Sequence, residues 1–189
     1  MKFRIALVAL ALAVAGCDRQ AADGAGGADA PQLEAPAPEN EPAREFAAAN
    51  DAARAAAAAL TVSVSLRLPD AGNAEGDAQE VLTLRGGNGL VVEAEITGAV
   101  SPATQVGGQT VRALLNIPVE EPQVLVYRVA NETKPDGGGG LCGADAATSV
   151  VVWEPSGPGD PVMKVLGVTG GAPGAAGARA CPMLEYRRG

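Results

Sequence analysis

Residues 60–68 read Leu-Thr-Val-Ser-Val-Ser-Leu-Arg-Leu, and this stretch shows the pattern that decides the fold. Apolar side chains occupy every second position, and small polar or charged side chains stand between them. Successive side chains of a β-strand point to opposite faces of the sheet, so this alternation predicts a strand that is buried on one face. The Pro, Asp, Gly and Asn residues within positions 69–73 favour a turn that ends the strand.

Similar apolar patterns recur along the rest of the chain. Residues 81–85 and 90–97 flank Gly86-Gly87-Asn88-Gly89, which predicts a β-hairpin. Further strands are expected at residues 110–117, 124–129, 148–153, 162–169 and 183–187. Turn-forming segments separate these strands, and no convincing helix pattern lies between them. We therefore predict an all-β domain at residues 60–189, either an antiparallel sandwich or a small barrel of about eight strands.

Residues 42–59 have a different composition, dominated by Ala, the strongest helix former. Phe46, Ala49, Ala53, Ala56 and Leu60 recur at spacings of three and four, which places them on one face of a helix. We predict an Ala-rich helix over these residues that packs thinly on the domain or lengthens a stalk. The alternatives are an Ala-seamed coiled coil between copies of the chain and a disordered segment. The oligomeric state stays open.

The first residues combine a positive start with a short apolar run. Lys2 and Arg4 lead into the apolar residues 5–15, a run too short to span a bilayer, which takes about 20 residues. These features predict a signal peptide. The run ends in Val14-Ala15-Gly16-Cys17, which resembles the lipobox of bacterial lipoproteins. The alternative is an ordinary signal peptide with Cys17 merely nearby.

The resemblance implies how the protein is attached to a membrane. In bacterial lipoproteins a diacylglyceryl group is added to the thiol of the lipobox Cys, here Cys17. The preceding residues, here 1–16, are then removed, and the new amino terminus is acylated with a fatty acid such as palmitate. Each buried methylene contributes about 0.8 kcal/mol, so two or three chains hold stably. We expect a membrane-anchored protein of the cell envelope that faces the periplasm, in either the inner or the outer membrane.

Residues 17–41 carry this anchor and then a run of Ala, Gly, Pro and acidic residues with little to bury. Such a composition predicts a disordered linker that holds the domain away from the membrane. The other two cysteines, Cys142 and Cys181, form an even pair in an exported protein. Their number and compartment predict a disulfide bond.

Charge and composition narrow the classes of function. Removal of residues 1–16 takes Lys2 and Arg4 with it and lowers the formal net charge from −8 to −10. An acidic domain is a poor candidate for nucleic-acid binding and a better one for a cationic partner. The chain has no His, which excludes Ser-His-Asp and Cys-His arrangements and the commonest metal ligand. We predict no catalytic residues, cofactor or metal, and no enzymatic activity.

Two weaker signals remain. Glu120 and Glu121, with Asp136 or Asp145, could supply oxygen ligands to a divalent cation, but their spacing matches no shaped cation-binding loop. Trp153, the one Trp of the chain, is expected to pack over the edge of the core, with anchoring of a partner as the alternative.

The sequence thus predicts a lipid-anchored envelope protein whose non-enzymatic β-domain binds a macromolecular partner, such as a protein, or serves a structural role. Its layout is similar to that of small lipid-anchored β-barrels that inhibit lysozyme, which makes lysozyme inhibition one alternative. The other alternative is a carrier of a small apolar ligand, because eight strands can enclose one small molecule.

Overall fold

A computed structural model describes residues 42–68, 78–155 and 162–189 of the chain. The lipobox and the linker predicted at residues 17–41 lie outside the described residues. The elements in chain order are β1 (Arg44–Ala48), α1 (Asp51–Ala56), β2 (Ala59–Arg67), β3 (Gln79–Gly86), β4 (Val91–Val100), β5 (Gln105–Val106), β6 (Gln109–Thr110), α2 (Val111–Leu115), β7 (Val124–Thr133), β8 (Ser149–Trp153), β9 (Val162–Thr169), β10 (Arg179–Ala180) and β11 (Leu184–Arg188).

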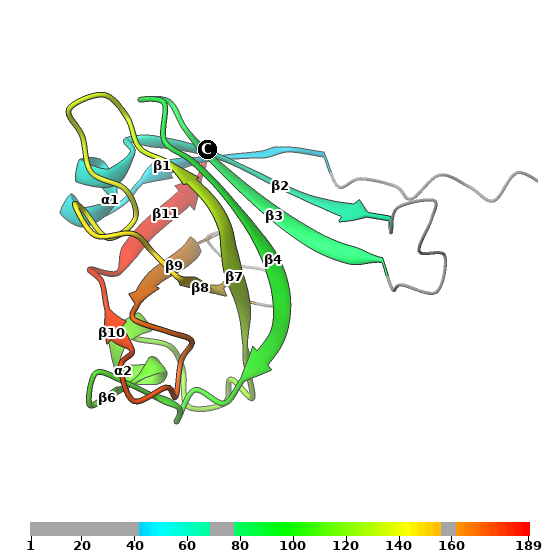
Figure 1. Cartoon of the computed structure of the whole chain (residues 1–189), viewed down its shortest axis with the longest axis vertical. Coiled ribbons are helices and arrows are strands. Elements are labelled where there is room, and N and C mark those ends of the chain that lie inside the picture. The colour runs from blue at the N-terminus through cyan, green and yellow to red at the C-terminus, as the bar shows by residue number, and fades with distance from the viewer. Residues whose placement is uncertain (1–41, 69–77, 156–161) are drawn as a thin grey trace, which may run out of the picture. The chain divides into compact units, whose positions relative to one another are not determined.

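Eight antiparallel strands close into a barrel, which confirms the predicted all-β fold and decides between its two forms. The strands follow one another in the order β9-β11-β1-β2-β3-β4-β7-β8, and the pairing of β8 with β9 closes the ring (Figure 1). The hairpin expected at residues 81–97 is confirmed as β3 and β4, which pair from Val81–Glu95 to Arg85–Val91. The short β10 pairs with Val168 and Thr169 of β9, beyond the residues of β9 that pair with β11.

Two apolar cores lie on opposite faces of the barrel wall. The interior core holds inward side chains from all eight strands, among them Phe46, Leu84 and Tyr186, all buried. The outer core lies against β7, β8 and β9, where Val151 and Leu166 pack under α2 and the segments beside it. Strands buried on both faces read as continuous apolar runs, which is why β8 has the sequence Ser-Val-Val-Val-Trp.

The Ala-rich helix predicted at residues 42–59 is present but covers only Asp51–Ala56. Residues Arg44–Ala48 form strand β1 instead, between β2 and β11. In this position Phe46 is buried in the interior core, and the backbone pairs on both sides. Helix propensity is a weak preference that such tertiary contacts override. The barrel therefore begins at Arg44, before the domain boundary predicted at residue 60.

The strand predicted at residues 110–117 is also wrong, because α2 occupies Val111–Leu115. Val111 and Leu115 are four residues apart, so one turn of helix turns both of them toward the outer core. The Thr110 hydroxyl accepts a hydrogen bond from the Ala113 amide, 3.2 Å away, and caps the start of the helix. Asn116 ends it in the left-handed conformation at φ 47°. Neither helix of the described residues combines the length and apolarity needed to cross a membrane.

Asn50 fixes α1 to the last strand of the barrel. Its side-chain oxygen caps the helix by accepting from the Ala53 amide at 2.8 Å and also accepts from the Glu185 amide at 3.2 Å. Its amide nitrogen donates to the Met183 carbonyl at 2.9 Å. Ala53 and Ala56 are then buried in the interior core, and α1 closes one end of the barrel.

Replacing Asn50 with Ala therefore removes a helix cap and two long-range hydrogen bonds together. We expect Asn50→Ala to lower the free energy of unfolding by about 2 kcal/mol, measured by urea denaturation. Asp51→Ala is the matched control, because the Asp51 side chain is 98% exposed and, among the described residues, forms an ion pair only with the exposed Arg54. Its effect should stay within about 0.5 kcal/mol. Equal losses in the two variants would contradict this role of Asn50.

The predicted disulfide is confirmed between Cys142 and Cys181, whose Cα atoms are 5.1 Å apart. It joins the loop before β8 to the residues before β11 and packs against Gly167 of β9. A Cβ atom added at Gly167 would lie 2.7 Å from the Cys142 sulfur, closer than atoms can pack. The absence of a side chain at this position makes room for the sulfur bridge.

Gly167→Ala should therefore destabilise the oxidised protein by about 1–3 kcal/mol, because the bridge and the strand must move apart. In a background where Cys142 is replaced by Ala, the cost should shrink, and a double-mutant cycle of unfolding free energies measures the difference. Gly87→Ala is the control, since its Cβ would meet only the Ala59 side chain at 3.9 Å. An unchanged cost without the sulfur would contradict the packing argument.

Candidate functional site

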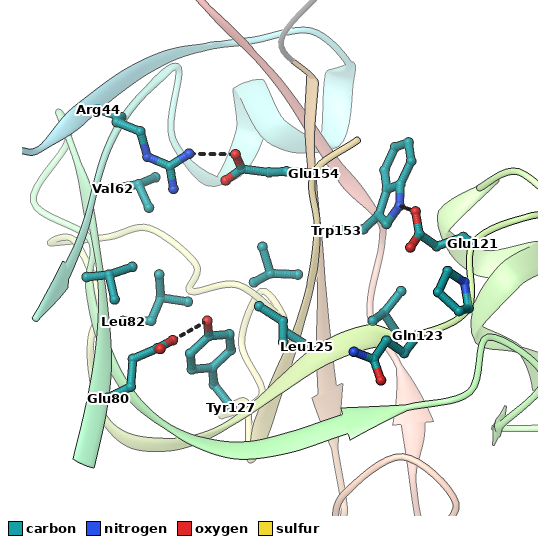
Figure 2. Close-up of a pocket in the computed structure, with 14 residues that line it drawn as sticks. Arg44, Val62, Glu80, Leu82, Glu121, Gln123, Leu125, Tyr127, Trp153 and Glu154 are labelled. Atoms are coloured by element: carbon teal, nitrogen blue, oxygen red, sulfur yellow. Dashed lines mark hydrogen bonds and ion pairs between the residues drawn. The ribbon is translucent and has the colours of Figure 1, made fainter. Parts of the chain in front are cut away.

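The candidate site is a pocket of about 600 Å³ at the end of the barrel opposite α1. Strands β1, β2, β3, β7 and β8 line it, together with the residues that follow β8 and precede β7. Its apolar wall is formed by Val62, Val64, Leu82, Pro122, Val124, Leu125, Val152 and Trp153. Its polar residues are Arg44, Glu80, Glu121, Gln123, Tyr127 and Glu154 (Figure 2).

The pocket exists because the barrel interior is filled unevenly. Near α1 the inward positions carry large side chains, including Leu60, Leu84 and Tyr186, and these are buried almost completely. At the other end, short Val side chains line the wall, and the longer polar side chains pair with one another along it. Leu125 lines the space and remains 40% exposed. An eight-stranded barrel has room either for packed side chains or for one small ligand. This barrel has packed side chains in one half and a pocket in the other.

An ion pair joins two strands across the mouth of the pocket. Arg44 of β1 donates to a carboxylate oxygen of Glu154, the residue after β8, at 2.5 Å. The two side chains are 25% and 32% exposed, so water screens the pair only in part. The Arg44 guanidinium also lies 5.7 Å from the centre of the Phe46 ring, within the range of a cation–π contact. These contacts hold both charged groups against the wall, and Figure 2 shows the pair of Arg44 with Glu154.

Tyr127 and Glu80 form a second polar pair in the pocket. The Tyr127 hydroxyl donates to a Glu80 carboxylate oxygen at 2.8 Å. Burial raises the pKa of the Tyr127 hydroxyl well above its ordinary value of 10, and the hydrogen bond to the Glu80 carboxylate raises it further. Tyr127 therefore stays a neutral hydrogen-bond donor at any physiological pH.

Trp153 connects the pocket wall to the outer core. Its indole N–H donates to a Glu121 carboxylate oxygen at 2.8 Å. On its other side, the Lys164 ammonium lies 5.3 Å from the ring centre and donates to the Asn116 carbonyl at 2.8 Å. Trp153 is 8% exposed, which confirms the expectation that it packs at an edge of the core.

The structure separates some of the sequence-predicted residues and brings others into the pocket. Glu121 lines the pocket, and the described residues contain no group of three acidic, His or Cys side chains able to hold a metal ion. Cys142 and Cys181 are remote from the pocket wall, and their role is the disulfide. Cys17 lies outside the described residues.

Sequence reasoning missed five of the six polar residues of the pocket: Arg44, Glu80, Gln123, Tyr127 and Glu154. A usable signal was present for two of them. Glu80 shares the inward face of β3 with Leu82 and Leu84, and Arg44 shares the inward face of β1 with Phe46. A charged residue at the end of an apolar strand face marks the place where a core stops being filled.

The chain matches no known protein-family model, no curated protein and no solved structure. The geometry of the pocket is therefore the main guide to what the protein does.

The two tyrosines of the chain offer a direct test of this interior. Tyr186 is fully buried, its hydroxyl has no hydrogen-bond partner among the described residues, and burial raises its pKa to about 12. Because the folded pKa values exceed the unfolded value of 10, the folded state holds protons that the unfolded state has lost above pH 10. We expect the two tyrosines to leave the free energy of unfolding unchanged below pH 10. Above pH 10 they should lower it progressively as the pH rises toward 12.

Tyrosinate absorbance measures the same effect. The folded protein should show little tyrosinate at pH 10, where the urea-unfolded chain is about half ionised. Tyr186→Phe should remove part of the alkaline loss of stability, and it should not destabilise the protein at neutral pH, because it removes an unpaired buried hydroxyl. If both tyrosines of the folded protein ionised with their ordinary pKa of 10, the two side chains could not be buried as described.

Proposed function

We propose that this protein is a lipid-anchored protein of the bacterial envelope. Its barrel binds one small, largely apolar ligand in the pocket at the end opposite α1. The observation that carries this proposal is the pocket itself, about 600 Å³ within a closed barrel. Ligand sites in proteins range from about 300 to 1,000 Å³ and combine apolar walls with a few placed polar groups. The pocket described above has this size and this composition.

The rigidity of the wall supports a binding role. The lining strands pair with neighbours along the sheet, and the side chains of Arg44, Tyr127 and Trp153 are each held by a carboxylate. A ligand entering such a site orders few groups that are not already ordered. Preorganisation of this kind lowers the entropy cost of binding.

The anchor would place this binding domain at a membrane surface. The lipobox resemblance at Cys17 supports attachment by acyl chains, and the composition of residues 18–41 supports a flexible tether. Such an arrangement suits a protein that takes up, holds or hands over a small amphipathic molecule near the bilayer. The macromolecular partner expected from the sequence, lysozyme included, stays a prediction.

Binding can be tested with 1-hexanol, using the fluorescence of Trp153, the one Trp of the chain. The full-length protein is reconstituted through its anchor in phosphatidylcholine vesicles and titrated. We expect a saturable one-site change in emission, because Trp153 lines the pocket. A purely linear response, as partitioning into lipid would give, would contradict the proposal.

A pocket-filling variant identifies the site of binding. Val64 is half-buried on the pocket wall, so Val64→Phe reduces the free volume without a large insertion into a packed core. We expect the variant to bind 1-hexanol about tenfold more weakly. Val119→Phe adds the same bulk at a residue that is 78% exposed and absent from the pocket wall, and it should bind as the wild type does. Equal affinities in the two variants would place the binding elsewhere.

A further inference from the structure

The charges inside the pocket are unbalanced. Among the described residues, three carboxylates line it, those of Glu80, Glu121 and Glu154, against the single guanidinium of Arg44. Only Glu154 is paired with that cation, at 2.5 Å. The hydrogen-bond donors to Glu80 and Glu121 are the neutral hydroxyl of Tyr127 and the neutral indole N–H of Trp153. A neutral donor stabilises a carboxylate but leaves its negative charge uncompensated.

Each of these carboxylates also keeps one oxygen available. The bonds named above use Oε1 of Glu80, Oε2 of Glu121 and Oε2 of Glu154, and the second oxygen of each accepts no hydrogen bond from the described residues. All three residues are partly buried beside apolar side chains. Charge interactions are stronger in such surroundings than in bulk water, because fewer solvent dipoles screen them.

We propose that the ligand of this pocket is an amphipathic cation, with an alkyl or similarly apolar body against the Val and Leu wall and an ammonium-type head at the carboxylates. This inference rests on the proposed ligand-binding function and names the class of ligand. The cavity supplies space for the apolar body, and the charge excess supplies the preference for a positive head. An anionic amphiphile meets the opposite situation, because Arg44, the only cation among the described residues that line the pocket, already pairs with Glu154.

Three probes with the same six-carbon chain and different heads separate the two proposals. Hexylammonium, 1-hexanol and hexanoate are titrated against the anchored full-length protein, with Trp153 emission as the readout. We expect hexylammonium to bind about tenfold more tightly than 1-hexanol, since a charge-assisted hydrogen bond is about twice as strong as a neutral one. Hexanoate should bind more weakly than either.

Two isosteric variants test the carboxylates directly. Glu80→Gln removes a charge while its amide oxygen can still accept from Tyr127, and it should reduce the preference for hexylammonium over 1-hexanol. Glu154→Gln removes the ionic partner of Arg44, so hexanoate should gain affinity in this variant while hexylammonium loses it. Glu93→Gln is the matched control, because Glu93 lies on β4 with its side chain outside the pocket wall. It should leave all three affinities unchanged.

The outcomes distinguish the failure of each proposal. Saturable binding of all three probes with equal affinity overturns the cationic ligand and leaves the binding function in place. Equal changes in Glu80→Gln, Glu154→Gln and Glu93→Gln overturn the cationic ligand as well, because they show an effect of net charge alone. No saturable binding of any probe overturns the binding function and the further inference together.

Discussion

Closure of the strand ring is the constraint on which the other features of this protein depend. The pairing of β8 with β9 and the insertion of β1 between β11 and β2 give every strand of the ring a neighbour on each side. A closed ring leaves no barrel strand as a free edge, which satisfies the backbone and removes a site of aggregation. It also confines all inward side chains to one space, so their sizes decide how much of that space is filled.

The two ends of this space differ because their inward residues differ. At one end Leu84, Tyr186 and the Ala residues of α1 form a packed core, which the Asn50 hydrogen bonds hold in place. At the other end the inward positions carry Val residues and paired polar groups, and a pocket remains. The packed core and the pocket thus occupy different halves of one barrel. If the proposed binding function is correct, substitutions in the packed half should act mainly on folding and those around the pocket mainly on ligand affinity.

The polar groups of the pocket are unevenly paired. Tyr127 remains protonated because it is buried and donates to Glu80. Glu154 has a cationic partner in Arg44, whereas Glu80 and Glu121 have only neutral donors. A binding site that leaves negative charge without a counter-ion in the free protein favours a ligand that brings one. This physical asymmetry links the pocket geometry to the proposed ligand class.

The sequence by itself determined the all-β class, most of the strands and the disulfide. The strands follow from the alternation of apolar and polar residues along short segments, and the disulfide follows from the number of cysteines. It also supplies the lipobox resemblance at Cys17, which stays a prediction. Only the tertiary structure decided that Arg44–Ala48 is a strand, since burial of Phe46 and pairing on both sides outweigh the helix propensity of Ala. Likewise, the pocket joins Arg44, Glu80, Tyr127 and Glu154 from four separate parts of the chain. Such proximity arises from ring closure, and no local pattern in the sequence encodes it.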